Sequence, residues 1–152
     1  ISTDHISPGR YFHLRTNLPE LTKHTLEDAR EDYAPNVKKG DFVVGGKNFG
    51  MGSSREHAAL MIKMSGADAV IAKSFARIFY RNAINIGLPA IICDTDRIDD
   101  KDVLSIDLEA GKLVDETKGF EIVFSPIPKA MMKILSEGGL VAYIKKYGDL
   151  KL

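Results

Sequence analysis

The fold class of this 152-residue chain is decided by residues 68–93, DAVIAKSFARIFYRNAINIGLPAIIC. The runs 68–72 and 89–93 are short and continuously apolar, which is typical of strands buried on both faces. Between these runs, apolar residues recur at the spacing of one helix face: Phe75, Ile78, Phe79, Ala83 and Ile86. Ser74 is expected to cap this helix and Gly87 to end it. The strand–helix–strand order predicts a right-handed crossover and a parallel sheet.

A further strand and a glycine-rich loop come before this unit. The segment 42–44, FVV, follows a Gly-Asp turn and predicts a short strand. Residues 45–52, GGKNFGMG, contain too much glycine for a helix or a strand. They predict a loop that bends sharply or approaches a ligand closely. We expect a helix to follow, from Ser53 or Ser54 to Gly66.

The N-terminal part predicts a helix that begins after Asn17, with Glu20 at the capping-box position. Its core face is expected to continue to Tyr33, because residues recur at helical spacing through that point: Leu18, Leu21, Thr25, Ala29 and Tyr33. We therefore expect helical structure to cover much of this segment.

The pattern changes after residue 94. Residues 103–108, 112–114 and 120–124 predict short antiparallel strands, and residues 129–137 and 140–147 predict two helices. We found no linker, repeat or low-complexity segment. We therefore expect an α/β fold in which residues 1–152 form one domain with an appended antiparallel part.

Composition excludes several classes of protein. The 21 basic and 21 acidic residues balance, so bulk charge gives no support to a nucleic-acid surface. No apolar run approaches the ~20 residues of a membrane span, and no signal-peptide pattern opens the chain. We therefore expect a cytoplasmic protein with no membrane or nucleic-acid partner. The chain opens on Ile1 without a methionine, which leaves open that a few residues or an edge strand are missing at the N-terminus.

Cys93 is the single cysteine, so an internal disulfide is impossible and a cysteine-ligated cluster cannot be built from this chain alone. Its apolar surroundings predict a buried strand thiol. His5, His13 and His24 lack metal-ligand spacing with a cysteine or a carboxylate. We expect no metal in this chain.

The glycine loop followed by Ser53-Ser54-Arg55-Glu56 has the properties of an anion site, because unpaired N–H groups and the helix dipole converge at a helix start. A phosphate loop lacks its Lys-Ser/Thr pair here, and the dinucleotide fingerprint lacks its third glycine, where Arg55 stands. A capping box alone explains one serine and Glu56, but not the glycines or the arginine. Two interpretations of residues 53–56 remain open: a well-capped helix start, or a carboxylate-binding site with Ser53 as a base.

Three motifs resemble the swivelling domain of the aconitase superfamily. They are residues 48–58, NFGMGSSREHA, residues 1–9, ISTDHISPG, and residues 72–87, AKSFARIFYRNAINIG. The last is similar to the small subunits of isopropylmalate isomerase and homoaconitase in particular, and the likeness runs the length of the chain. The resemblance implies a swivelling β/β/α three-layer domain. The implied activity is that of a hydro-lyase, which isomerises a hydroxy polycarboxylate by dehydration and rehydration.

The same resemblance implies that the catalytic groups are supplied by two different chains. A cluster-bearing large subunit would hold a [4Fe–4S] cluster, and this chain would be active only with that partner. Ser53 would be the base, Ser54 would assist through its hydroxyl or N–H, and Arg55 would hold a substrate carboxylate beside Gly52. Asp4 would orient a histidine of the partner.

Substrate choice depends on residues 10–16, RYFHLRT, which in this family face the variable end of the substrate. The segment 14–16 is similar to the Leu-Arg-Thr of homoaconitase small subunits. An apolar isopropyl group would strip water from Arg15 without providing a partner, which is costly. Arg15 therefore favours a tricarboxylate of the homoaconitate or aconitate type, with 3-isopropylmalate close behind. Two additional residues after Tyr11 leave the direction of Arg15 open, and a non-catalytic anion-binding or interaction module remains the alternative function.

Overall fold

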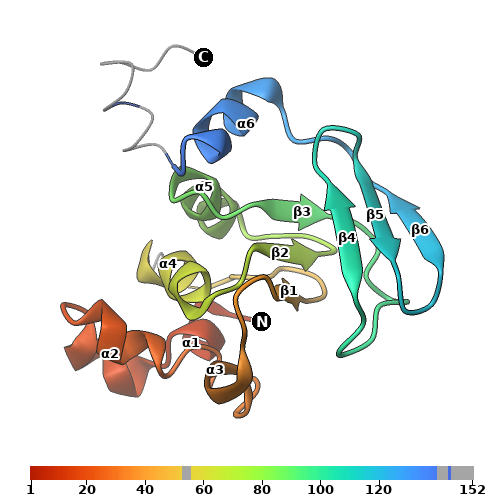
Figure 1. Ribbon diagram of the computed structural model, residues 1–152. Helices are drawn as coiled ribbons and strands as arrows, with labels where there is room; N and C mark the ends of the chain where they lie inside the picture. The colour runs from red at the N-terminus through yellow and green to blue at the C-terminus, as the bar shows by residue number, and fades with distance from the viewer. Residues whose placement is uncertain (53–55, 140–143, 145–152) are drawn as a thin grey trace.

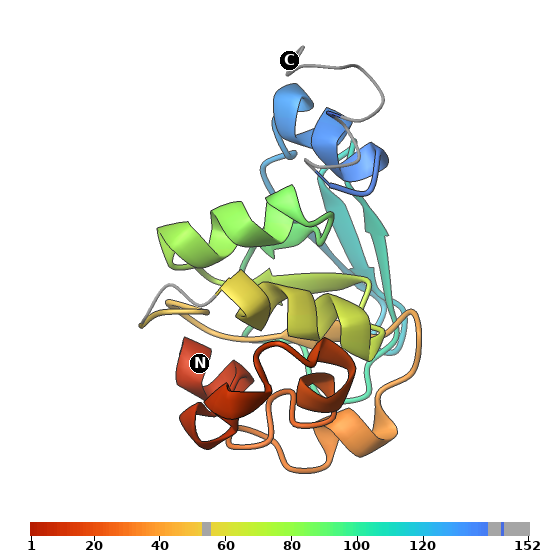
Figure 2. The same cartoon turned by 90° about the vertical axis from the view of Figure 1, so that its left-hand side faces the viewer.

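The computed structural model describes residues 1–52, 56–139 and 144, with the backbone alone at Asp4 and Glu56. Its centre is a parallel sheet of three strands in the order β1 (Phe42–Val44), β2 (Ala69–Ala72) and β3 (Ala90–Ile92). Helix α4 (Glu56–Ser65) connects β1 to β2, and α5 (Arg77–Asn85) connects β2 to β3. Both helices cover one face of the sheet (Figures 1 and 2). The expected parallel strand–helix–strand units are confirmed.

A second sheet covers the opposite face of the parallel one (Figure 1). It contains β4 (Leu104–Asp107), β5 (Lys112–Asp115) and β6 (Phe120–Val123), paired antiparallel in that order. The strands β4 and β6 alternate between half-buried and exposed residues, because one face of this sheet meets solvent. The three antiparallel strands expected in the C-terminal half are confirmed.

Two hydrophobic cores lie on either side of strand β2. Val70 and Ala72 belong to the core on the helix side, and Ala69 and Ile71 belong to the core shared with Leu113 of the second sheet. Successive side chains of a strand point to opposite faces, so a strand with four buried residues requires a cover on both sides. The result is three layers of helices, parallel sheet and antiparallel sheet, which confirms the expected β/β/α fold.

Four short helical segments make up the N-terminal part, which packs against α4 (Figure 2). They are α1 (Thr3–Ile6), η1 (Gly9–Leu14), α2 (Leu18–Thr22) and α3 (Tyr33–Asn36). The amide N–H of Glu20 donates to the side chain of Asn17 over 3.4 Å, so the expected N-cap is confirmed.

The prediction that the helix continues to Tyr33 is wrong, because α2 ends at Thr22 and turns follow it. The Thr25 hydroxyl donates to the carbonyl of Thr22 over 2.6 Å, and Leu26 adopts a left-handed φ of 58°. Leu26 is buried, and its N–H donates to the carbonyl of Ile6 over 2.9 Å. A long-range hydrogen bond and burial therefore override the local helical spacing.

Of the other predictions about helix ends, one is wrong and one is confirmed. Ser74 does not cap α5: its Oγ accepts from the N–H of Asn48 over 2.7 Å, and Ala76 stands at the N-cap without a side-chain bond. Gly87 does follow the end of α5, with φ of +84°. Helix α6 (Lys129–Ser136) confirms the first C-terminal helix, and the helix expected at 140–147 falls outside the described residues except for residue 144. Within the described parts, no helix is long and apolar enough to cross a membrane.

Candidate active site

The N-terminal segment lies along the glycine loop. The N–H of Gly50 donates to the carbonyl of Ile1 over 2.6 Å, and the N–H of Thr3 donates to the carbonyl of Met51 over 2.8 Å. Ser2 and Met51 form a parallel bridge between these bonds. The two motifs, with residues 10–47 between them in the sequence, therefore meet before α4.

The loop itself is fixed to the start of α5. Phe49 is fully buried, and its ring packs edge-on against Phe75 and Phe79 at centroid distances of 5.9 and 5.3 Å. The N–H of Phe49 donates to Ser74, and the N–H of Ala76 donates back to Phe49, over 2.9 and 3.0 Å. These contacts fix the position of the loop backbone before Gly52.

The carboxyl ends of the parallel strands supply a second attachment for this loop. The N–H of Lys73 donates to Gly46 over 3.1 Å, and the Thr95 hydroxyl donates to Gly45 over 2.8 Å. The Lys73 ammonium pairs with Asp96, and its hydrogen bond holds the pKa of the Asp96 carboxyl below its usual value. The loop is thereby held by residues that follow β2 and β3.

Position 52 favours glycine for two reasons. Its φ of +116° is one that other residues rarely adopt, and a Cβ at this position would lie 3.1 Å from Oγ1 of Thr3. Thr3 is 3% exposed, and among the described residues its hydroxyl has no hydrogen-bond partner. Buried hydroxyls are normally paired, so Thr3 is a candidate site residue that the sequence did not single out. Its only sequence signal is its position before Asp4.

The structure describes only part of the expected catalytic set. Asp4 belongs to α1, where only its backbone is described, and Ser53, Ser54 and Arg55 lie outside the described residues between Gly52 and α4. Helix α4 begins at residue 56, so the loop leads into a helix start, where backbone N–H groups and the helix dipole attract anions.

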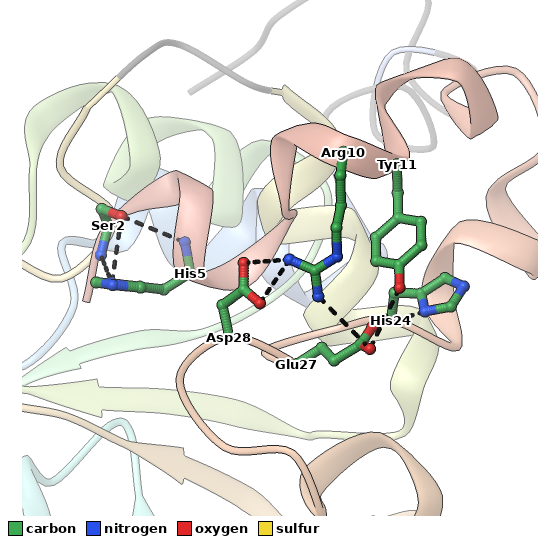
Figure 3. A network of polar contacts seen from close by, with 7 residues as sticks. All are labelled: Ser2, His5, Arg10, Tyr11, His24, Glu27 and Asp28. Atoms are coloured by element: carbon green, nitrogen blue, oxygen red, sulfur yellow. Dashed lines mark hydrogen bonds and ion pairs between the residues drawn. The ribbon is translucent and has the colours of Figure 1, made fainter.

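A capping box fixes the backbone around Asp4. The N–H of His5 donates to Oγ of Ser2 over 3.2 Å, and the N–H of Ser2 donates to Nδ1 of His5 over 3.0 Å (Figure 3). These reciprocal bonds satisfy two donors at the start of α1. The position of Asp4 relative to the glycine loop is therefore set by local bonds and by the bridge to Met51.

Arg15 follows η1 and folds back on it. Its Nη1 donates to the carbonyl of Phe12 over 3.3 Å, and its Cζ lies 4.4 Å from the centre of the Phe12 ring. Both side chains are exposed, and no carboxylate of the described residues forms an ion pair with Arg15. Arg15 therefore retains N–H donors for another partner.

The described residues do not fit an iron–sulfur cluster, whose irons are bound by cysteine thiolates. They contain no group of three or more histidine, cysteine or acidic residues that could hold a metal. Cys93 lies just beyond β3 and is only partly buried, so the expectation of a buried strand thiol is wrong. Burial, and secondarily Asp94, raise the pKa of the Cys93 thiol, which makes it a poor ligand and nucleophile at neutral pH.

A cavity of about 630 Å³ lies elsewhere, between α5, the end of β3 and α6. Its lining is largely apolar, with Arg77 and Arg81 from one face of α5. No residue expected to act in catalysis or substrate binding lines it.

Comparisons with known proteins agree with this arrangement. Residues 3–95 match the family described as the aconitase C-terminal domain. The chain is 64% identical over 152 residues to 3-isopropylmalate dehydratase small subunit 2 of Archaeoglobus fulgidus, covering 100% of this chain and 92% of that protein. It is 52% identical over 150 residues to the methanogen homoaconitase small subunit of Methanothermobacter thermautotrophicus, covering 98% of this chain and 86% of that protein.

A solved structure has the same fold. The crystal structure of 3-isopropylmalate dehydratase from Methanocaldococcus jannaschii matches with a TM-score of 0.91 and 49% identity, over 97% of this chain and 87% of that one. The chain therefore belongs to the aconitase C-terminal domain family and, within it, to the 3-isopropylmalate dehydratase and homoaconitase small subunits.

Proposed function

We propose that this small subunit acts in a heteromeric hydro-lyase, which isomerises a hydroxy polycarboxylate by removing and re-adding water. The observation that carries the proposal is the pairing of residues 1–3 with residues 50–51 at the start of α4. It joins the motif containing Asp4 to the motif containing Ser53 on one surface. A merely well-capped helix does not require this pairing.

Each polar residue of the two motifs has a role in the proposal. Ser53 takes the proton next to the departing hydroxyl, and Arg55 holds a substrate carboxylate while favouring the charged serine. Ser54 assists through its hydroxyl or N–H, and Gly52 allows the backbone to approach the substrate. Asp4 orients a histidine of the partner chain. A helix start supports these roles, because it favours negative charge on substrate and serine alike.

The site is proposed to be completed by a large subunit that holds a [4Fe–4S] cluster. The relatives' description as small subunits supports such a partner. Met51 and Phe12, near the two motifs, are each 51% exposed, and exposed large apolar side chains around a site support a covering chain. The cluster is placed in the partner because Cys93 is the single cysteine of this chain.

For the substrate, we propose a tricarboxylate of the homoaconitate or aconitate type, with 3-isopropylmalate close behind. The relatives carry both kinds of name, so membership of the family does not choose between them. The support is Arg15, which is exposed and has donors left beyond its bond to Phe12. A carboxylate provides a partner for such donors, and an isopropyl group does not.

The role of Ser53 is tested by mixing the chain with a cluster-loaded large subunit and following the absorbance of the unsaturated acid. We expect Ser53→Ala to lower kcat by at least about a hundredfold, which is the lower range of general-base contributions. Ser136→Ala is the matched control, since its hydroxyl donates to the Lys133 carbonyl over 3.0 Å at the end of α6, outside the two motifs. Unchanged turnover of Ser53→Ala would exclude it as the base. An anion-binding module without turnover would show no activity with any hydroxy acid.

The substrate proposal is tested by comparing isopropylmalate, homocitrate and citrate in the same complex. We expect Arg15→Val to reduce kcat/KM for the tricarboxylates about tenfold or more relative to isopropylmalate, because one charge-assisted hydrogen bond is lost. Arg97→Val is the matched control: Arg97 also stacks on an aromatic ring, with Cζ 4.0 Å from the centre of Phe120. Equal losses for all three substrates would contradict the assignment of Arg15.

A further inference from the structure

Segment η1, which immediately precedes Arg15, is not held by the hydrophobic core. None of its six residues is buried. A short 3₁₀ segment also has weak internal hydrogen bonding, so it does not hold a position by itself. Besides the buried Pro8 before it and the bond of 2.8 Å from the Asn17 N–H to the Leu14 carbonyl after it, η1 is held by polar and aromatic contacts of its side chains.

Those contacts form a network on the segment 24–28 (Figure 3). Nη1 of Arg10 donates to both carboxylate oxygens of Asp28 over 2.7 and 2.8 Å, and its Nη2 lies 3.5 Å from Glu27. The Tyr11 hydroxyl donates to Glu27 over 3.3 Å. The Tyr11 ring stacks on His24 with centroids 3.7 Å apart, and Nδ1 of His24 lies 2.7 Å from the other Glu27 oxygen.

The other side of this network is fixed to the core. Glu27 and Asp28 directly follow Leu26, which is 3% exposed and bonded through its N–H to the carbonyl of Ile6. Ile6 is itself fully buried at the end of α1, the helix that carries Asp4. The network therefore connects an unburied segment to a buried point next to the candidate active site.

We infer that Arg10, Tyr11, His24, Glu27 and Asp28 are positioning residues that hold η1 and thereby set the direction of Arg15. The inference rests on the proposed function, because Arg15 is assigned to the substrate only there. Arg10 and Asp28 are about half and one-third exposed, and exposed ion pairs contribute little to global stability. Their effect is therefore on the placement of η1 and on substrate discrimination.

The experiment uses Asp28→Asn, with Asp100→Asn as the matched control. Asp100 accepts two bonds of 2.8 Å from Arg30, so it loses the same kind of exposed bidentate pair without touching η1. Amide hydrogen exchange of the chain is measured first. We expect residues 9–15 to exchange about tenfold faster in Asp28→Asn, and as in the parent chain in Asp100→Asn.

Kinetics of the reconstituted complex supply the second readout. We expect Asp28→Asn to raise KM for the preferred tricarboxylate about tenfold while kcat changes less than about twofold, because a shifted arginine weakens binding more than the chemical step. Asp28→Glu keeps the carboxylate and is expected to restore KM. A merely structural role would change thermal stability but would not separate KM from kcat or allow this rescue.

The outcomes are distinguishable from failure of the proposed function. Exchange of residues 9–15 that is the same in Asp28→Asn and the parent chain overturns the inference, whatever the activity. Faster exchange with no change in KM overturns the link to Arg15. A parent complex that dehydrates no hydroxy acid overturns the proposed function, while the exchange data still decide whether the network holds η1.

Discussion

Gly50 is the position where the fold of the candidate site is most sensitive to a single methyl group. Its φ of +82° lies in the left-handed region, and an added Cβ would stand 2.3 Å from Cγ of Phe79. Atoms in contact normally lie at least ~3.5 Å apart. Phe79 is 3% exposed and packs against Phe49, so neither ring is free to move away. Gly50→Ala therefore combines backbone strain with overpacking.

The size of the effect follows from these two contributions. A left-handed backbone costs a residue with a Cβ about 1–2 kcal/mol, and overpacking a well-filled core costs about 1–3 kcal/mol. We expect Gly50→Ala to lower the free energy of unfolding by about 2–5 kcal/mol. For a chain of this length, 1 kcal/mol shifts Tm by about 2–4 °C, so Tm should fall by roughly 4–20 °C.

Substitutions at two other glycines separate the cost of backbone strain from the cost of overpacking. Gly119 has φ of +76° but open space around its Cβ position, so Gly119→Ala should show the backbone strain alone, about 1–2 kcal/mol. Gly46 has open space and no left-handed φ, so Gly46→Ala should change stability by less than about 0.5 kcal/mol. Urea denaturation followed by far-UV circular dichroism gives the three values on one scale.

The reasoning is refuted if Gly50→Ala costs no more than Gly119→Ala. That result would mean that the packing of Phe79 against the loop adds nothing to stability. The loop would then be free to move away from α5, and the proposed placement of Ser53 would lose its support.

The remaining predictions concern the cores and two titrating groups. Leu113→Ala should lower the free energy of unfolding, measured by urea denaturation, by about 2–5 kcal/mol, because Leu113 is fully buried between the sheets. Val123→Ala, at a position 72% exposed, should lower it by less than about 0.5 kcal/mol. Equal losses in the two variants would contradict the two-sheet core. Burial raises the pKa of Tyr33, whose hydroxyl lies 2.7 Å from that of Ser65. The protonated Tyr33 side chain therefore contributes stability below the ordinary tyrosine pKa of about 10, and this contribution is lost as pH rises through the higher pKa of the folded state. Unfolding measured from pH 9 to 11 should therefore lose more stability in the parent chain than in Tyr33→Phe, and parallel curves would refute this. Burial likewise raises the pKa of Cys93, so iodoacetamide at pH 7.5 should react several-fold more slowly with the folded chain than with the urea-unfolded one, and equal rates would exclude the shift.

Much of the parallel core was predictable from local patterns. A strand such as Ala69–Ala72, apolar at every position, must be buried on both faces, and the alternation with amphipathic α5 predicts a parallel connection. The cap at Asn17 and the glycine after α5 were also visible, because such signals depend on residues only a few positions apart. The glycine-rich loop between β1 and α4 was visible in the sequence for the same reason.

The sequence did not predict the contacts that join distant segments. Leu26 breaks the helical spacing because it is buried and bonded to Ile6, and Ser74 bonds to Asn48 instead of capping α5. The attachment of η1 through Arg10 and Asp28 was equally invisible, since two exposed charges eighteen residues apart carry no local signal.

By itself, the sequence therefore determined the fold class, the parallel sheet and the segment that contains the candidate site. Only the tertiary structure decided that residues 1–3 lie against residues 50–51, that Thr3 is buried beside Gly52, and that the second sheet closes the other face of β2. The physical reason is the range of the interactions. Strand, cap and turn preferences act within a few residues, but pairing between distant segments depends on surfaces that exist only once the layers have packed.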